Sequence, residues 1–191
     1  MESRPPKSKT PAFAEYPIEF VLDEEGYRIR DPESGFGWKV TEESLENRRK
    51  WAAEHYKGTE PIEILNRAYF LDPHDQSKVP RLMYYGLGVK TKQLVDYAKQ
   101  HKLVAYDENK FNVYTEALLM RATNRHLQQL CRTDLTLETP YCESAQWVIT
   151  LHTNHNWFVQ ELADPNDIRK VIKTIQTELQ LEQPAMWYYA A

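Results

Sequence analysis

The segment His152–Trp157 holds the side chains of this sequence whose types and spacing best suit chemistry. His152 and His155 lie three residues apart in a run of short polar residues. Imidazole is the commonest protein ligand for zinc and copper, and two imidazoles across a tight turn can converge on one ion. His152 and His155 are therefore the candidate metal ligands of this chain.

Such a metal site needs a third ligand. Glu161, Glu143 and Cys142 are the side chains that pairing of neighbouring strands would bring near the two imidazoles. The same segment also has a purely structural interpretation, because Asn and His are common in turns and an exposed hairpin tip favours them. Of the two interpretations, the structural one is favoured.

Two lysine-bearing segments form a second candidate site. They carry Lys90, Lys92, Lys99 and Lys102, and Arg169, Lys170 and Lys173. Basic faces with aromatic neighbours can hold an acidic partner or single-stranded nucleic acid. The net charge of −4 disfavours non-specific nucleic-acid binding, and a charged face opposite an apolar stripe is typical of any surface helix.

The acidic clusters do not indicate catalysis. Asp23–Glu25 suits a turn, and Glu42 with Glu43 suits the first turn of a helix. The sequence has no nucleophile-elbow pattern and no glycine-rich phosphate loop. We therefore expect a non-catalytic binding or protein-interaction module. The alternative is a small, metal-dependent enzyme around His152 and His155, and a third interpretation is nucleic-acid binding through the lysine-bearing helices.

The C-terminal run Met186–Tyr189 places four large side chains close to the end of the sequence. Such side chains either dock on their own domain or form a surface for a protein partner or for self-association. Docking within the chain is the favoured interpretation.

The first half of the sequence predicts a hairpin followed by helices. Residues 18–22 and 27–30 alternate around a turn at Gly26. A helix is expected over residues 41–56, and a second helix is expected to start at Pro61, with Ile62, Leu65, Ala68 and Tyr69 on one face. Residues 82–85 fit either a strand or a buried helical turn.

The second half predicts helices over residues 91–102 and 112–130. In the second of these helices Tyr114, Ala117, Leu118, Arg121, Leu127 and Leu130 recur at helical spacing. Residues 135–138, 147–152 and 157–160 then predict a three-stranded antiparallel meander.

The last predicted helix begins at Asp164 and Pro165. Its apolar stripe is expected to cover the meander and consists of Ile168, Val171, Ile172, Ile175 and Leu179. The order of hairpin, helices, meander and helix indicates an α+β fold, with an antiparallel sheet packed against several helices.

The length of 191 residues fits one domain, which we expect over residues 16–191 behind a disordered, proline-containing tail at 1–15. The sequence has no apolar run of membrane-spanning length and no secretory signal. A soluble, cytoplasmic protein is therefore expected, with Cys131 and Cys142 as free thiols.

Overall fold

The computed structural model divides into two compact units, Met1–Gly58 and Thr59–Ala191. The described residues are 18–31, 38–72, 74, 79–107, 111–157 and 165–191. The expected tail at 1–15 lies outside the described residues, and the single domain expected over 16–191 stays a prediction.

The first unit contains short antiparallel bridges and one helix. Leu22 and Arg28 form a bridge across a turn in which Gly26 has a positive φ of 86°. The helix α1 (Glu42–His55) begins where the Thr41 side chain accepts a hydrogen bond from the Ser44 backbone N–H at 3.3 Å. The helix is therefore close to the one that the sequence predicts over 41–56.

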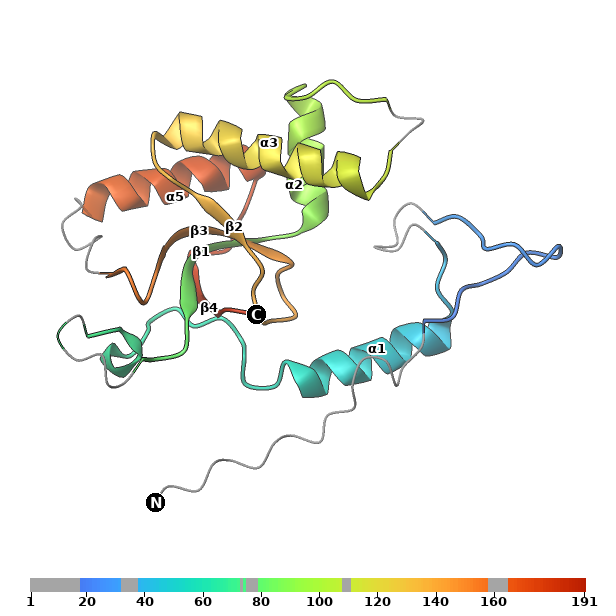
Figure 1. The fold of residues 1–191 in the computed structure, drawn as a ribbon, viewed down its shortest axis with the longest axis horizontal. Coiled ribbons are helices and arrows are strands. Elements are labelled where there is room, and N and C mark those ends of the chain that lie inside the picture. Colours follow the sequence, from blue (N-terminus) through green and yellow to red (C-terminus); the bar gives the residue numbers. More distant parts are fainter. Residues whose placement is uncertain (1–17, 32–37, 73, 75–78, 108–110, 158–164) are drawn as a thin grey trace, which may run out of the picture. The chain divides into compact units, whose positions relative to one another are not determined.

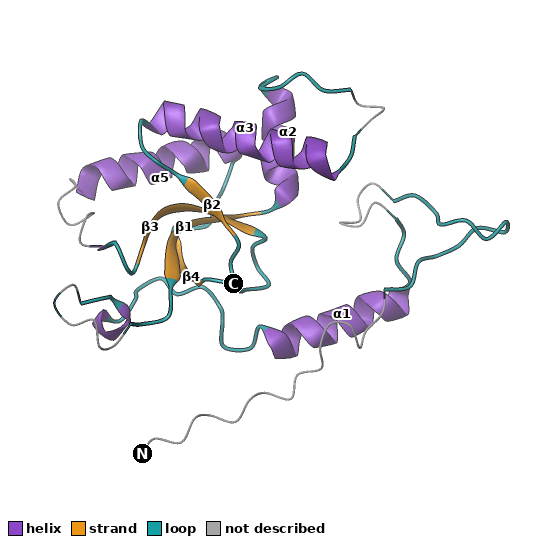
Figure 2. Ribbon diagram, in the orientation of Figure 1, coloured by secondary structure: helices purple, strands orange, loops and turns teal. Residues whose placement is uncertain are grey.

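The second unit has an α+β fold with one four-stranded antiparallel sheet (Figure 2). Its strands are ordered β2-β3-β1-β4, and every neighbouring pair is antiparallel. The elements of this unit are η2 (Arg67–Tyr69), β1 (Met83–Val89), α2 (Thr91–Gln100), α3 (Val113–Cys131), β2 (Thr136–Glu138), β3 (Trp147–Thr153), α5 (Pro165–Leu179) and β4 (Met186–Tyr189).

The neighbours of β3 differ from those of the predicted meander. β2 pairs with one edge of β3 as expected, but β1 occupies the other edge, where residues 157–160 were expected. Residues 158–160 lie outside the described residues. Gly86 and Gly88 both lie within the ladder of β1, and a Cβ atom at either position would meet close neighbours.

The helix predicted to start at Pro61 is wrong. Ile62 instead pairs with Trp187 through two backbone hydrogen bonds of 2.8 and 2.9 Å. Only the three-residue 3₁₀ helix η2 follows, capped by the Asn66 side chain. The backbone N–H and C=O groups of Ile62 form their hydrogen bonds with Trp187 of β4. This pairing outweighs the local helical pattern, since it satisfies the groups that would otherwise need partners within a helix.

Three helices pack together on one side of this sheet: α2, α3 and α5 (Figure 1). The core between them contains Leu87 and Ile149 from the sheet and Ile175 from α5, all with no exposed surface. Leu179 is also buried, whereas Ile168 and Ile172 are half-buried. The predicted apolar stripe of α5 therefore faces inward most strongly at its C-terminal end.

No helix among the described residues is long and apolar enough to cross a membrane. Cys131 and Cys142 are both free, as the sequence predicts.

Candidate functional site

His152 lies near the end of β3 inside an aromatic cluster. The centroid of its ring is 4.8 Å from that of Tyr85 and 5.4 Å from that of Trp187. Its Nδ1 atom is buried and has no hydrogen-bond partner. Burial lowers the pKa of His152 to about 4, because the charged imidazolium would lose its hydration. The imidazole is therefore neutral at pH 7.

His155 is held by the backbone next to β1. Its Nε2 atom lies 2.8 Å from the carbonyl oxygen of Pro80. Among the described residues, no group of three or more His, Cys, Asp and Glu side chains could hold a metal ion. Glu161, one of the expected third ligands, lies outside the described residues. The assignment of His152 and His155 as metal ligands stays a prediction.

Asn154, between the two histidines, is fully buried. Its Oδ1 accepts a hydrogen bond from the Met83 backbone N–H at 2.7 Å, and its Nδ2 donates to the carbonyl oxygens of Tyr69 and Arg81. Its own backbone carbonyl accepts from the N–H of Leu71. The side chain therefore connects three backbone segments, a role that the sequence pattern of an exposed polar tip does not reveal.

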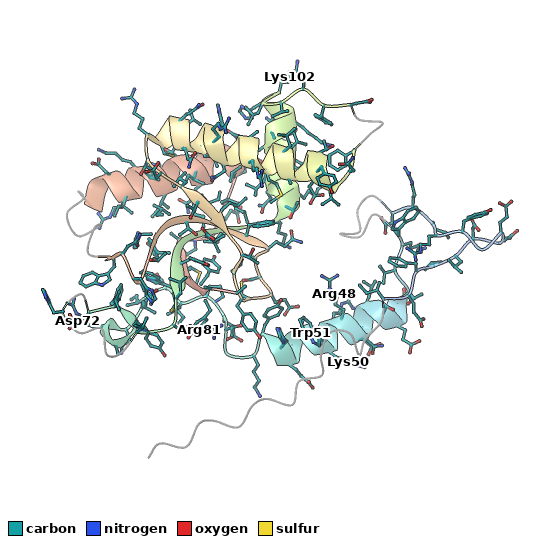
Figure 3. All side chains as sticks on the ribbon, viewed as in Figure 1. Arg48, Lys50, Trp51, Asp72, Arg81 and Lys102 are labelled. Carbon is teal, nitrogen blue, oxygen red and sulfur yellow. The ribbon has the colours of Figure 1, made fainter. Side chains whose placement is uncertain are left out.

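The lysine-bearing helices are partly neutralised. The Lys92 ammonium lies 3.8 Å from Asp96, and Lys170 lies 3.2 Å from Asp167. Lys102, beyond the end of α2, projects away from the sheet (Figure 3). The basic character of these faces is weaker than the count of lysines suggests, and nucleic-acid binding through them stays a prediction.

The C-terminal aromatic run docks on its own unit as strand β4. Trp187 is 6% exposed and Tyr188 is 3% exposed. Tyr189 is half-buried, with the Arg81 guanidinium 4.7 Å from the centre of its ring. The favoured interpretation of this run is therefore correct, and most of its aromatic surface is used within the unit.

A partly buried cluster of polar and aromatic side chains joins the three helices. The Tyr97 hydroxyl donates a 2.7 Å hydrogen bond to Glu178 Oε2, which links α2 to α5. Its ring stacks on His101 at 4.1 Å, and His126 of α3 is 5.9 Å from both rings. Burial and the bond to Glu178 raise the pKa of Tyr97. The hydroxyl therefore stays protonated and serves as a donor between helices.

The outer face of α3 carries an unusual exposed stripe. Tyr114 is 86% exposed and Leu118 is 48% exposed, and Arg121 and Arg125 continue the same line toward the C-terminus of the helix. These four residues stand at i, i+4, i+7 and i+11, so they share one face. We call them the α3 stripe. Val113, beside its apolar end, is 78% exposed.

The α3 stripe ends in two positive charges, those of Arg121 and Arg125. Within the described part of the chain, no carboxylate lies within 4 Å of the guanidinium group of Arg121 or Arg125. A surface that is apolar at one end and cationic at the other is complementary to an amphipathic partner that carries acidic residues.

Contacts at the start of α3 and on its buried face determine which face of the helix is exposed. Asn112 caps the helix by accepting from the backbone N–H groups of Tyr114 and Thr115. On the opposite face the Thr123 hydroxyl donates to the carbonyl oxygen of Leu94, and Leu119 and Leu127 are buried in the core. These contacts hold the opposite face against the core, which leaves the stripe in solvent.

The helical spacing of Tyr114, Ala117 and Leu118 suits a core face, but the structure places the core elsewhere. The buried residues of α3 are Leu119, Met120, Thr123 and Leu127. Arg121 and Arg125 are the sequence signal that could have separated the two faces, because they extend the line of Tyr114 and Leu118 with charge.

Comparisons of this chain with protein-family models, with curated proteins and with solved structures found no match. Its function is therefore inferred from the geometry of its surface.

Proposed function

We propose that this chain is a non-catalytic protein-interaction module whose α3 stripe binds an acidic, amphipathic segment of another protein. The observation that supports this proposal is the solvent exposure of Tyr114 and Leu118 beside two arginines that form no ion pair with any described carboxylate. Exposed apolar groups with a polar rim commonly mark interaction surfaces, and Tyr and Arg are enriched in the residues that dominate binding energy.

The partner's chemistry follows from the order of side chains along α3. Tyr114 and Leu118 offer apolar contact area at the N-terminal end of the helix, and Arg121 and Arg125 offer donors for carboxylates farther along. An amphipathic helix with apolar residues at one end and Asp or Glu at the other matches both parts of the stripe.

The experiment is a selection of peptides from a random display library against the full chain. Selected peptides are expected to be enriched in sequences that combine apolar and acidic residues at helical spacing. Tyr114→Ser with Leu118→Ser is expected to weaken their binding by about tenfold or more, since loss of buried apolar contacts costs about 1.4 kcal/mol or more. Arg121→Glu with Arg125→Glu is expected to weaken acidic peptides and to favour basic ones.

Two matched variants serve as controls. Leu130→Ser removes an exposed apolar side chain of α3 that lies outside the stripe, and Lys170→Glu reverses a charge on α5. Both should leave the affinity unchanged. Peptides that bind the stripe variants as tightly as the wild type contradict the proposal. A dimer of this chain that Tyr114→Ser with Leu118→Ser abolishes would replace the partner with a second copy.

A further inference from the structure

A cavity of about 670 Å³ lies beside the C-terminal end of β1 and the start of α2, on residues that do not belong to the α3 stripe. Part of its wall is apolar and is formed by Pro61, Val89, Ala145 and Met186. Sites for small molecules usually occupy about 300–1,000 Å³ and combine apolar walls with a few polar groups. This cavity has the size and the apolar wall that such a ligand needs.

Positively charged side chains outnumber negatively charged ones at this cavity. Lys90 and Lys92 contribute two ammonium groups, and Asp96 contributes one carboxylate. Lys92 pairs with Asp96 at 3.8 Å, with both side chains largely exposed. Within the described residues, no carboxylate lies within 4 Å of the Lys90 ammonium. The cavity therefore has a net positive charge and one ammonium group free to meet an anion.

The backbone N–H and carbonyl groups of Gly88 and the N–H of Lys90 already have hydrogen-bond partners, so they do not compete for the ligand. The Gly88 N–H donates to the Tyr188 hydroxyl at 3.1 Å, and its carbonyl accepts from Gln183 Nε2 at 2.6 Å. The Lys90 N–H donates to Gln93 Oε1 at 2.8 Å. These bonds hold the wall in place before a ligand arrives, which reduces the ordering cost of binding.

Gly88 also keeps the cavity wall in its present position. A Cβ atom at this residue would lie 2.5 Å from the Tyr188 hydroxyl oxygen and 2.9 Å from the Cβ of Ala145. Three segments that line the cavity therefore meet at van der Waals contact only because residue 88 has no side chain.

We infer that this cavity binds a small organic anion. The apolar body of the ligand packs against Val89, Ala145 and Met186, and its carboxylate, sulfonate or phosphate group lies at Lys90 and Lys92. This function is separate from peptide binding by α3, since the two surfaces share no residue.

The test uses two fluorescent probes with similar apolar bodies, the anion 8-anilinonaphthalene-1-sulfonate and the neutral N-phenyl-1-naphthylamine. The full chain is expected to bind the anion saturably. Lys90→Gln with Lys92→Gln should weaken anion binding about fivefold, equivalent to about 1 kcal/mol for lost charge interactions, and should change the neutral probe less than about twofold. Lys99→Gln with Lys102→Gln is the matched control outside the cavity and should change neither probe.

A second pair of variants locates the probes. Ser144→Trp places a large side chain at the cavity wall and should abolish binding of the anion, whereas Glu143→Trp, at the exposed neighbouring residue, should not. Tyr114→Ser with Leu118→Ser should also leave anion binding intact. The inference is overturned if the full chain binds the anion more weakly than about 1 mM. It is likewise overturned if Ser144→Trp leaves binding unchanged, or if the lysine substitutions weaken both probes equally.

Discussion

At the scale of single residues, His152 and Asn154 near the end of β3 differ in how their buried polar atoms are hydrogen-bonded. Asn154 is fully buried and uses both its oxygen and its nitrogen in hydrogen bonds. His152 is half-buried, and its buried Nδ1 atom has no hydrogen-bond partner. A satisfied buried polar group stabilises the position of the backbone that it binds, whereas an unsatisfied one lowers the free energy of unfolding.

Replacement of Asn154 is expected to destabilise the second unit strongly. Asn154→Ala leaves the N–H of Met83 and the carbonyls of Tyr69 and Arg81 without their side-chain partner, at a cost of about 3 kcal/mol. Asn154→Asp should cost at least as much, because a carboxylate would face two carbonyl oxygens. Urea unfolding followed by circular dichroism measures both. The exposed Asn156→Ala is the control, and equal losses for Asn156 and Asn154 would contradict the proposed linking role.

His152 is expected to make the free energy of unfolding depend on pH. Its pKa falls to about 4 in the folded chain, from an ordinary value of 6.5, so the unfolded state binds more protons between these two values. Above pH 6.5 the imidazole is mostly neutral in both the folded and the unfolded state, so it does not lower the free energy of unfolding there. Stability is lost as the pH falls from 6.5 toward 4, at up to about 1.4 kcal/mol per pH unit.

His152→Phe should remove this contribution while keeping an aromatic ring beside Tyr85 and Trp187. The measurement is a series of urea unfolding curves at pH values of about 7.5, 6 and 5, which include the range where stability is expected to fall. The exposed His74→Gln is the matched control for the loss of an imidazole. A wild type and a His152→Phe variant with the same pH profile would show that this ring titrates normally.

At the scale of elements, β1 depends on two glycines that occupy its ladder. A Cβ atom at Gly86 would overlap the backbone carbonyl oxygen of Ile149, whereas one at Gly88 would meet the side chains of Tyr188 and Ala145. A backbone neighbour within a paired strand cannot move without breaking the ladder, but a side chain can rotate or shift. The two positions should therefore tolerate a methyl group differently.

Gly86→Ala is expected to lower the free energy of unfolding by about 3 kcal/mol or more, and Gly88→Ala by about 1–2 kcal/mol. Tyr188→Phe combined with Gly88→Ala should recover part of the loss, since it removes the closest atom. Thermal or urea unfolding of the two single variants and the double variant gives the coupling between residues 88 and 188. Equal costs at both glycines would argue against the role of the neighbouring backbone.

At the scale of the whole molecule, the division into two compact units predicts that the second unit is stable without the first. Unit 2, Thr59–Ala191, contains the sheet, α2, α3, α5 and the clusters of buried apolar residues that include Leu87, Val148 and Met83. A fragment of residues 59–191 should therefore fold alone, because a chain of this length with several buried apolar clusters can offset its conformational entropy.

The fragment is expected to unfold cooperatively and to keep the backbone amide shifts of the full chain in its strands and in α2, α3 and α5. Heteronuclear NMR spectra and urea unfolding of the two proteins make the comparison. An unfolded fragment would instead support the single domain expected over residues 16–191.

Local patterns in the sequence predicted several elements well. The Thr41 cap, the acidic first turn of α1 and the apolar spacing of α5 are features of neighbouring residues, and the corresponding helices lie close to their expected bounds. The α+β class followed from the order of these elements. The docking of Trp187 and Tyr188 followed from the cost of leaving large apolar side chains in water.

Only the tertiary structure decided which segments pair and which faces are buried. The pairing of β1 with β3, the extended course of Ile62 beside Trp187 and the burial of Asn154 depend on contacts between residues far apart in the chain. The exposure of Tyr114 was decided in the same way, since α3 offers apolar residues on two faces and packing against α2 and the sheet selects one. Such choices depend on the sum of many distant contacts, which no short pattern of neighbouring residues contains.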